Sequence, residues 1–338
     1  MKVLLCSYQA VANPGGGVFT QVMNTYKALT EYGIEVELFN PWKHYNWSKI
    51  DVIHLFSTDM RNYFLLKALP SSVPLIVSPI IDKLYPPLFV KILTAFSNAF
   101  PPQIITSYKS HCLAFSRAKI IVVRSLHEKR LIEKGFGVTP SRVRLVFNGV
   151  DEKFLKGDAQ YFYSRYGLKD FVLYVGQIGE PRKNLLCLLK VAETLSDVEF
   201  VLIGPILETD YARRVLSFAN HLKNVHVLGR LPEDDLLSAY AACKVFVLPS
   251  FAEGTGLAGL EAGLAGANVV ITNRGGTPDY FRDFAIMVEP TYKSLLEGIK
   301  KALETPRNPV QRDIIKKKFL WRNVIKKLIA IYEEAVNK

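Results

Sequence analysis

The stretch VFVLPSFAEGTGLAGLEAGLAGANVVIT, residues 245–272, decides the fold expected for this chain. Two short apolar runs, at 245–249 and 268–272, enclose a segment of small residues that can form a helix. A strand, a helix and a second strand in this order predict two parallel strands of one sheet, joined by a helical crossover. The stretch therefore predicts an α/β fold.

The same alternation extends outward along most of the chain. Further apolar runs lie at 3–6, 35–39, 51–56, 74–78, 119–123, 143–147, 171–176, 198–204 and 224–229. Helical patterns separate them, as between Phe19 and Leu29, where the following Gly33 suits a helix C-terminus. We therefore expect two Rossmann-like, doubly wound parallel-sheet domains, whose ligands bind beyond the carboxyl ends of the strands, in a cleft between the domains.

The expected domain boundaries follow from a weakly periodic, tyrosine-rich stretch at 151–168, which is interpreted as a linker. An N-terminal domain is expected over 1–155 and a C-terminal domain over 168–318. The tail, 320–338, is expected to form a long amphipathic helix that packs on another element. Its apolar positions at helical spacing are Val324, Leu328, Ile331 and Ala335.

Composition favours a folded protein in a reducing compartment. The chain has 338 residues and 49% apolar content, enough for about two domains with proper cores. No run approaches 18 apolar residues, and the first ten residues suit a strand better than a secretory signal. A cytoplasmic protein is therefore expected, with an option of peripheral contact at the inner membrane face. Four scattered cysteines without metal-ligand spacing predict neither disulfides nor zinc: Cys6, Cys112, Cys187 and Cys243.

Charge is concentrated in the first half of the chain. The formal net charge is +12, and residues 1–150 hold 17 lysines and arginines against 8 aspartates and glutamates. A basic surface favours a phosphorylated ligand, an anionic lipid or a nucleic acid, and simple solubility explains it equally well. No nucleic-acid partner is expected, because the sequence has no aromatic RNA-binding motif and no helix-turn-helix pattern.

The glycines between 254 and 263 need an explanation, because a glycine inside a helix costs about 1 kcal/mol relative to alanine. Exposed amides at a helix N-terminus bind phosphate, and small residues let a diphosphate approach closely. Glu253 and Glu261 bracket this segment, and carboxylates accept hydrogen bonds from sugar hydroxyls. The pattern predicts a nucleotide-sugar site. The alternative is a loop acid and a helix acid with no ligand.

This E-x7-E spacing, followed by Gly275 and Gly276, resembles the retaining GT-B glycosyltransferases of the glycogen-synthase-like family 4. The resemblance implies two Rossmann-like domains facing across a cleft: an N-terminal acceptor-side domain and a C-terminal nucleotide-sugar-binding domain. It also implies that the helix at 320–338 packs back on the first domain. Other segments follow in the family's order: GGG (15–17), SRAKIIVVRSLHEKRLIEKG (116–135), VRLVFNGVDEKF (143–154), GQIGEPRKN (176–184), LGRLPEDDLLSAYAACKVFVLPS (228–250) and FLWRNV (319–324).

The resemblance implies a role for each motif residue of the donor site. Glu261 matches the glutamate that binds the ribose hydroxyls, and Glu253 matches the one that faces the transferred sugar. Gly256 and Leu257 match backbone amides near the diphosphate and the sugar. Lys183 matches the lysine that neutralises the charge of the departing nucleotide, and it counts as catalytic together with Glu253.

Further residues complete the implied site. Gln177 and Arg230 belong to the nucleotide-sugar-binding set, and Gly16 and Gly17 form the first-domain loop that faces the diphosphate and the acceptor. His54 ends the run at 51–56 and is a catalytic candidate on the acceptor side. A histidine whose hydrogen bonds are satisfied within its strand explains that position equally well.

The sequence departs from the family pattern in two places. Gln177 stands where the family has arginine, so one cation near the diphosphate is missing. Arg182 is a substitute, but neighbours such as Arg182 and Lys183 rarely face the same way. Phe56 stands in the second place of the family's H-x-H, which weakens the acceptor-side histidine motif.

The resulting hypothesis is a retaining transfer of a sugar, most simply a hexose, to a hydroxyl acceptor that is a glycan or a lipid-linked saccharide. The donor is a UDP-, GDP- or ADP-sugar, and no cofactor is expected. No D-x-D motif occurs, so no metal is expected at the diphosphate. The alternatives are a nucleotide-sugar hydrolase or epimerase of the same fold, and a nucleotide-sugar-binding protein without catalysis.

The stretch KLYPPLFVKILTAFSNAFPP, residues 83–102, bears on the acceptor. It is rich in leucine, phenylalanine and isoleucine and lies in the basic half of the chain. A one-sided apolar helix with basic neighbours can lie in a membrane surface beside a lipid-linked acceptor. Packing into the core explains the same residues and is the preferred interpretation.

Overall fold

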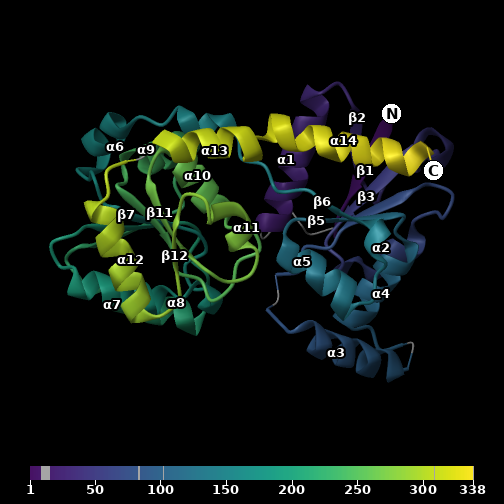
Figure 1. The fold of residues 1–338 in the computed structure, drawn as a ribbon, viewed down its shortest axis with the longest axis horizontal. Helices are drawn as coiled ribbons and strands as arrows, with labels where there is room; N and C mark the ends of the chain where they lie inside the picture. Colours follow the sequence, from purple (N-terminus) through teal and green to yellow (C-terminus); the bar gives the residue numbers. More distant parts are fainter. Residues whose placement is uncertain (9–15, 83, 102, 308, 338) are drawn as a thin grey trace. The chain divides into compact units, whose positions relative to one another are not determined.

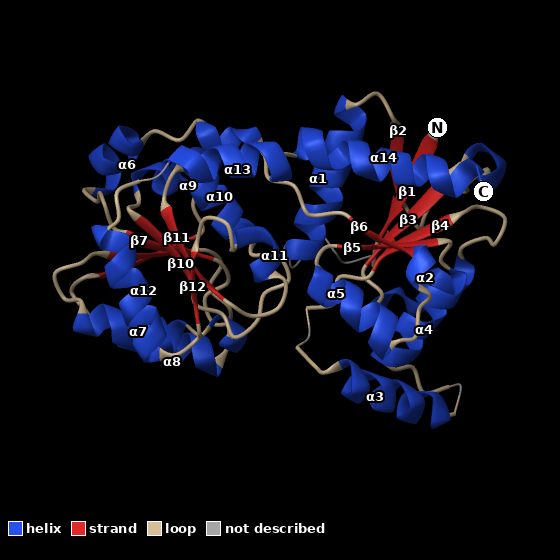
Figure 2. Ribbon diagram, viewed as in Figure 1, coloured by secondary structure: helices blue, strands red, loops and turns tan. Residues whose placement is uncertain are grey.

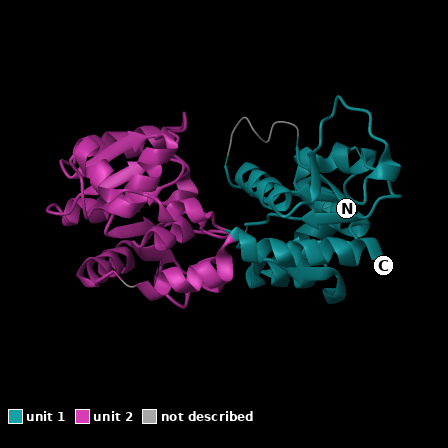
Figure 3. Ribbon diagram, turned by 90° about the horizontal axis from the view of Figure 1, so that it is seen from above, with its two compact units in different colours: residues 1–149, 321–338 teal, residues 150–320 magenta. Residues whose placement is uncertain are grey.

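The computed structural model describes residues 1–8, 16–82, 84–101, 103–307 and 309–337. These residues form two compact units, Met1–Gly149 with Trp321–Lys338 and Val150–Leu320, which Figure 3 colours separately. Each unit is a six-stranded parallel sheet with helices packed on it (Figures 1 and 2). The predicted α/β fold with two doubly wound parallel sheets is therefore confirmed.

The first unit has the strand order β2-β1-β3-β4-β5-β6. β2, the next strand in sequence, lies on one side of β1, and the following strands β3 to β6 lie on the other side. The topological switch point therefore lies between β1 and β3. Its elements are β1 (Lys2–Cys6), α1 (Gly17–Glu31), β2 (Glu35–Leu38), β3 (Val52–Phe56), α2 (Tyr63–Ala68), β4 (Leu75–Ser78), α3 (Pro87–Ala99), α4 (Ser107–Arg117), β5 (Ile120–Val123), α5 (Leu126–Arg130), β6 (Val143–Leu145) and α14 (Trp321–Asn337).

Alternate residues of the central strands β1, β3, β4 and β5 enter two different cores. Leu4 and Cys6 of β1 face one hydrophobic cluster, whereas Val3 and Leu5 face another on the opposite side of the sheet. This two-sided burial explains why the strands are almost continuously apolar.

The C-terminal helix α14 completes the second of these clusters. All four of its positions at helical spacing are buried there, together with residues of β1, β3 and α1: Val324, Leu328, Ile331 and Ala335. Arg144 of β6 adds a salt bridge to Glu334, with 2.6 Å between Nη2 and Oε1. The last helix of the chain therefore packs on the sheet formed by its first residues.

The second unit has the strand order β12-β11-β10-β7-β8-β9, with its switch point between β7 and β10. β12 is short and was not expected from the sequence. The elements are α6 (Ala159–Tyr166), β7 (Val172–Val175), α7 (Leu185–Thr194), β8 (Phe200–Ile203), α8 (Asp210–Asn220), β9 (Val225–Gly229), α9 (Glu233–Ala242), β10 (Val245–Leu248), α10 (Leu257–Ala265), β11 (Asn268–Thr272), α11 (Thr277–Phe281), β12 (Ile286–Val288), α12 (Tyr292–Glu304) and α13 (Pro309–Phe319).

The linker interpretation of the stretch 151–168 is wrong, because α6 forms there and packs on α9. Phe162 is fully buried, and Gly167 ends the helix in a left-handed conformation with φ +71°. The hydroxyls of Tyr161 and Tyr166 donate to the carboxylate of Asp235 on α9, at 2.8 and 2.7 Å. The tyrosines thus belong to a helix interface.

The preferred interpretation of the stretch 83–102, packing into the core, is also wrong for most of its apolar residues. Only Val90 and Ser97 of α3 are buried, whereas Leu88, Ile92 and Phe96 are exposed. Within the described parts of the chain, no helix combines the length and apolar character needed to span a bilayer.

Candidate functional site

Lys183 and Glu253 meet at the switch point of the second unit, where the loops after β7 and β10 leave neighbouring strands. The Lys183 Nζ atom lies 2.6 Å from Glu253 Oε1, and the two side chains are only 14% and 9% exposed. The residues are 70 positions apart in the sequence. The fold therefore joins the two donor-site residues that the sequence analysis treats as catalytic.

Arg182 contacts the same carboxylate, so the expectation that it faces away from Lys183 is wrong. Its Nη1 atom lies 3.5 Å from Glu253 Oε2 and donates to the carbonyl of Ala252. Both cations reach the carboxylate because Pro181–Lys183 forms a tight 3₁₀ turn, in which successive side chains lie closer than along a strand. Glu253 is therefore held by two positive charges.

Asn184 fixes this turn, although no motif in the sequence marks it as a site residue. Its φ is +56°, a left-handed conformation that asparagine adopts more readily than most residues. Its Nδ2 atom donates to the carbonyls of Pro249 and Pro290, each at 3.1 Å. Asn184 thus ties the Lys183 turn to the loop after β10. The signal in the sequence is an asparagine directly after two cations.

The glycine pair after β11, Gly275 and Gly276, lies against the backbone carbonyl of Glu253. A Cβ atom on Gly275 would lie 2.2 Å from the carbonyl oxygen of Glu253, and the residue has a φ of +83°. The N–H of Gly276 donates to that same oxygen at 2.9 Å. Only glycine allows this approach, so the pair sets the position of the Glu253 backbone.

Three glycines of the stretch 245–272, namely Gly256, Gly259 and Gly263, serve two purposes. Gly256 precedes α10 with a φ of +73° and so directs the chain into the first turn of that helix. Cβ atoms on Gly259 and Gly263 would lie 3.0 Å from Phe281 and 2.7 Å from Ile315. Close packing against α11 and α13, rather than room for a diphosphate, explains these two glycines.

Glu261 lies one turn into α10 and accepts a hydrogen bond from Tyr240 of α9, with 2.7 Å between Oη and Oε2. Burial raises the pKa of Glu261, while the Tyr240 hydroxyl and the charge of Lys153 act in the opposite direction. Tyr240 is itself fully buried. It is a second residue near the donor motif that the sequence analysis missed.

The other donor-site candidates are more loosely placed. Gln177 follows β7 and is half-buried, with its backbone carbonyl accepting from the Tyr174 hydroxyl at 3.1 Å. Leu257 begins α10 and is also half-buried. Arg230 follows β9, the strand at the edge of the sheet, and its side chain is exposed. Arg230 forms no described contact with the Lys183–Glu253 pair.

The contacts of His54 favour the structural alternative over a catalytic role. The ring is 1% exposed, with Nδ1 at 2.7 Å from the Tyr332 hydroxyl and Nε2 at 2.8 Å from Ser78 Oγ. Burial lowers the pKa of His54 to about 3, so the ring is neutral at ordinary pH. Both ring nitrogens are occupied inside the core formed by α14 and the sheet.

The glycine loop after β1 is described only in part. Gly16 has a φ of +94° and precedes α1, and Gly17 is the first residue of that helix. Both are exposed, and no described atom lies within 4 Å of a Cβ built on either of them. Gly15 lies outside the described residues.

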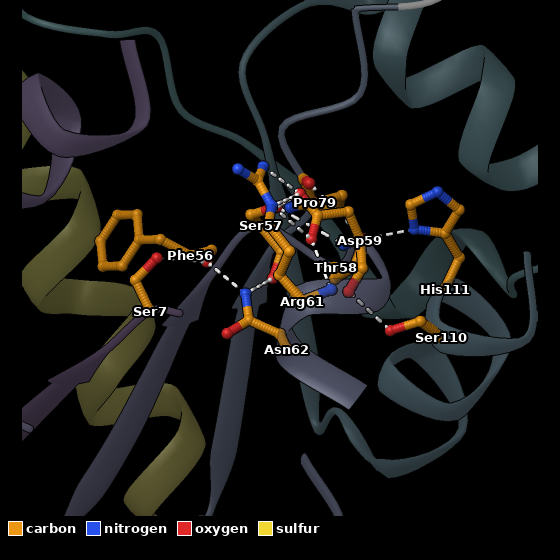
Figure 4. Close-up of polar contacts among 10 residues, drawn as sticks. All are labelled: Ser7, Phe56, Ser57, Thr58, Asp59, Arg61, Asn62, Pro79, Ser110 and His111. Carbon is orange, nitrogen blue, oxygen red and sulfur yellow. Dashed lines mark hydrogen bonds and ion pairs between the residues drawn. The ribbon is translucent and has the colours of Figure 1, made fainter. Parts of the chain in front are cut away.

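A polar cluster occupies the switch point of the first unit, at the carboxyl ends of β1 and β3 (Figure 4). Ser57 and Ile80, just beyond β3 and β4, have positive φ values of 67° and 56°, a conformation that costs non-glycine residues about 1–2 kcal/mol. Asn62 holds this loop, because its Nδ2 atom donates to the carbonyls of Phe56 and Ser57 at 3.1 and 2.8 Å. Backbone strain of this kind is concentrated at functional sites.

The side chains of this cluster present charge and hydrogen-bonding groups. Arg61 Nε lies 3.1 and 3.0 Å from the two carboxylate oxygens of Asp59, and its guanidinium stacks 3.8 Å from the centre of the Tyr8 ring. Burial alone would raise the pKa of Asp59, but hydrogen bonds from Arg61 lower it. His111 Nδ1 lies 2.7 Å from Thr58 Oγ1 (Figure 4).

Comparison with known proteins identifies the second unit. Residues 163–321 match the family model of the glycosyl transferases group 1. Over these residues the chain is similar to the glycosyl transferases group 1. O-antigen chain mannosyltransferase B of Escherichia coli is 30% identical over 179 residues, which cover 48% of this chain and 45% of the relative. An uncharacterized glycosyltransferase of Methanocaldococcus jannaschii is 26% identical over 227 residues, covering 64% and 59%. The matches thus span about half the length of these relatives.

Solved structures extend the likeness of the fold beyond the group 1 domain. HepE of Anabaena, in complex with UDP, has a TM-score of 0.75 with 18% identity and covers 99% of this chain and 100% of its own. Sucrose-phosphate synthase from Thermosynechococcus elongatus has a TM-score of 0.72 with 16% identity and covers 98% of both chains. The fold is GT-B. The Lys183–Glu253 pair and Glu261 all lie within the residues that match the group 1 family model.

Proposed function

We propose that the chain is a retaining glycosyltransferase that moves a hexose from a nucleoside-diphosphate sugar to a hydroxyl acceptor. The observation that carries this proposal is the Lys183–Glu253 pair, buried at the switch point of a group 1 domain, where ligands of doubly wound sheets bind. Burying two charges costs free energy that their attraction often fails to recover, so a nearly buried ion pair adds little to stability, and this supports a role in binding a charged ligand.

Each donor group has a partner in this arrangement. Lys183 and Arg182 supply two positive charges for the diphosphate, so Arg182 replaces the cation that is missing at Gln177. When these cations turn to phosphate oxygens, Glu253 is released to accept hydrogen bonds from the hydroxyls of the transferred sugar. Glu261, held by Tyr240, accepts hydrogen bonds from the ribose.

The reaction breaks the bond between the anomeric carbon and the leaving phosphate oxygen and forms a bond from that carbon to the acceptor oxygen. The acceptor's proton passes to the departing phosphate, on the same face of the sugar. Catalysis then consists of positioning and charge stabilisation, with Lys183 neutralising the phosphate. Because protein cations take this role, a chelator is expected to leave the rate unchanged.

The donor and acceptor classes rest on chemistry and on the relatives. Mannosyltransferases are among the similar proteins, and HepE structures contain UDP or UDP-glucose, which supports a nucleoside-diphosphate hexose as the donor, with UDP, GDP or ADP as the nucleotide. We assign acceptor binding to the polar cluster around Asp59 and Arg61, because charged groups and strained backbone occur together there. A glycan or a lipid-linked saccharide supplies the hydroxyl.

Two variants test this assignment. Glu261→Ala is expected to weaken binding of the free nucleoside diphosphate, because it removes the ribose contact. Glu253→Ala is expected to bind the nucleoside diphosphate nearly as well as wild type but to transfer the sugar at least about 10-fold more slowly. Binding is measured by calorimetry, and turnover by release of nucleoside diphosphate with and without an acceptor panel.

The results separate the proposal from its alternatives. Equal loss of affinity in both variants contradicts the division of roles between the two carboxylates. Nucleotide release that is independent of acceptor indicates hydrolysis instead of transfer.

A further inference from the structure

Helix α3 carries its apolar residues on the face turned away from the protein. Leu88, Phe89, Ile92 and Phe96 are 70%, 44%, 56% and 64% exposed, whereas Val90 and Ser97 are buried. With 100° between successive residues, the four exposed side chains fall within one arc, opposite the buried pair. An ordinary surface helix has the reverse arrangement, with polar side chains toward solvent.

Aromatic rings extend this apolar surface at both ends of the helix. Tyr85 lies against Phe89 with 5.4 Å between ring centres, and Phe96 lies against Phe100 with 5.0 Å between ring centres. Tyr85 and Phe100 are themselves exposed. The surface is therefore a stripe of neighbouring apolar side chains along the helix, not a single exposed side chain, and contiguous apolar patches mark interaction sites.

The opposite face fastens α3 to the first unit. A Cβ atom on Gly135 would lie 3.1 Å from Val90, so the helix packs closely on the turn that follows α5. After the helix, the Lys109 ammonium donates to the carbonyls of Phe100, Pro101 and Ile104 at 2.8, 2.7 and 3.0 Å. Figure 1 shows α3 at the margin of the unit, beyond α4 and α5. The exposed stripe belongs to a firmly attached helix.

The sequence around the stripe is basic, although one of its arginines, Arg124, is buried in salt bridges with Asp82 and Glu128. Residues 83–127 contain six lysines and arginines and no aspartate or glutamate. One of the lysines, Lys91, lies on α3 beside the apolar arc and is exposed. A partner with negative charge at its surface and an apolar interior matches this combination.

We propose that α3 lies in the surface of an anionic phospholipid bilayer, with its apolar stripe among the upper acyl chains and Lys91 at the headgroup phosphates. The 13 residues of α3 extend about 20 Å, too short to cross a bilayer of about 30 Å, so the helix lies in the plane of the membrane. Amphipathic helices with basic polar residues bind membranes in this way. The inference goes beyond glycosyl transfer and does not depend on it.

The test is co-sedimentation of the full chain with vesicles, without donor or acceptor. Wild type is expected to bind vesicles of phosphatidylglycerol and phosphatidylcholine and to bind pure phosphatidylcholine much more weakly. The triple variant Leu88→Gln, Ile92→Gln, Phe96→Gln is expected to bind at least about 10-fold more weakly, because three apolar side chains no longer enter the bilayer. Lys91→Glu is expected to lower binding about fivefold or more, an effect that high salt removes.

Matched variants control for general changes in surface character. The triple variant Trp42→Gln, Phe64→Gln, Ile206→Gln removes three exposed apolar side chains elsewhere, and Lys300→Glu makes the same charge change on α12. Both are expected to bind like wild type. All substituted side chains are exposed, so circular dichroism and melting temperature are expected to stay constant.

Three results would overturn the proposal. The first is a wild-type chain that does not bind anionic vesicles, and the second is an α3 triple variant that binds as well as its control. The third is a wild-type chain that self-associates in analytical ultracentrifugation through the stripe, which would make this face a protein interface.

Discussion

Glu253 is a nearly buried carboxylate that depends on the cations beside it. Lys183→Ala removes the closer cation and the expected diphosphate partner at the same time. One charge-assisted contact is worth about 1.5–3 kcal/mol, so kcat/KM is expected to fall roughly 10- to 150-fold. Steady-state kinetics with a nucleoside-diphosphate sugar measures this change.

One further variant and two matched controls extend this test. Lys190→Ala, an exposed lysine of α7, is the matched control and is expected to leave kcat/KM unchanged. Arg182→Gln is expected to cost less than Lys183→Ala, because the Arg182 side chain is 36% exposed and screened by water. Arg213→Gln on α8 is its control. A Lys183→Ala enzyme of full activity would show that the diphosphate binds elsewhere.

Glu261 combines the binding role proposed for it with a cost to stability. Its folded pKa is raised, chiefly by burial, so ionisation is less favourable in the folded chain than in the unfolded chain. The folded state therefore loses stability as pH rises through the ionisation of Glu261. Glu261→Gln is expected to raise the melting temperature at neutral pH, with a smaller gain near pH 4, while nucleotide affinity falls about fivefold.

Melting curves across this pH range, with calorimetric titration of the nucleoside diphosphate, measure both effects. Glu297→Gln, an exposed glutamate of α12, is expected to change neither quantity. A Glu261→Gln chain less stable than wild type at neutral pH would contradict the account of its burial.

The turn between β11 and α11 acts as a support for the loop after β10. Gly275→Ala would place a Cβ atom 2.2 Å from the Glu253 carbonyl, in addition to the cost of a φ of +83°. We expect a loss of roughly 3 kcal/mol in the free energy of unfolding, together with weaker binding of the sugar nucleotide, because Glu253 must shift. Urea unfolding and calorimetry measure the two losses.

Gly229 at the end of β9 offers a control of the same backbone class. Its φ is +65°, but no described atom lies within 4 Å of a Cβ built there. Gly229→Ala is expected to cost only the conformational term, about 1 kcal/mol, and to leave ligand binding unchanged. Equal effects of the two substitutions would show that the contact with Glu253 is unimportant.

In the first unit the C-terminal helix α14 packs on the sheet that contains β1, and His54 lies in this contact beside Tyr332. Its pKa of about 3 lies far below the ordinary value of 6.5, so the unfolded chain takes up a proton that the folded chain refuses. The contribution of His54 to the free energy of unfolding is therefore fully present above about pH 6.5 and is lost as pH decreases toward 3. Near pH 4.5 the loss from this group is about 3 kcal/mol.

Urea unfolding at neutral pH and near pH 4.5 checks this prediction. His54→Gln is expected to be less stable at neutral pH, because it disturbs the contacts to Tyr332 and Ser78, but to lose less stability on acidification. His221→Gln, an exposed histidine after α8, is expected to retain the wild-type pH dependence. An unchanged slope in His54→Gln would assign the acid sensitivity to other groups.

The sequence by itself determined the parallel strands of both units. Among the described residues, eleven of twelve strands correspond to apolar runs, and the central strands are almost continuously apolar because they are buried on both faces. β12 was not predicted, because a strand of three residues is too short to show a periodic pattern. The tail helix was also readable, since its four apolar positions share one face.

Only the tertiary structure decided which partners those residues have. The residues of α6 were interpreted as a linker because their apolar pattern is weak. Their tyrosines bond to Asp235, which is distant in sequence, so the pattern could not show this partner. Arg182 joined Lys183 on one carboxylate because Pro181–Lys183 forms a 3₁₀ turn beside the loop that carries Glu253. Spacing gave α3 an apolar face but did not say which face met the core. Such contacts join residues far apart in the chain, and periodicity describes only near neighbours.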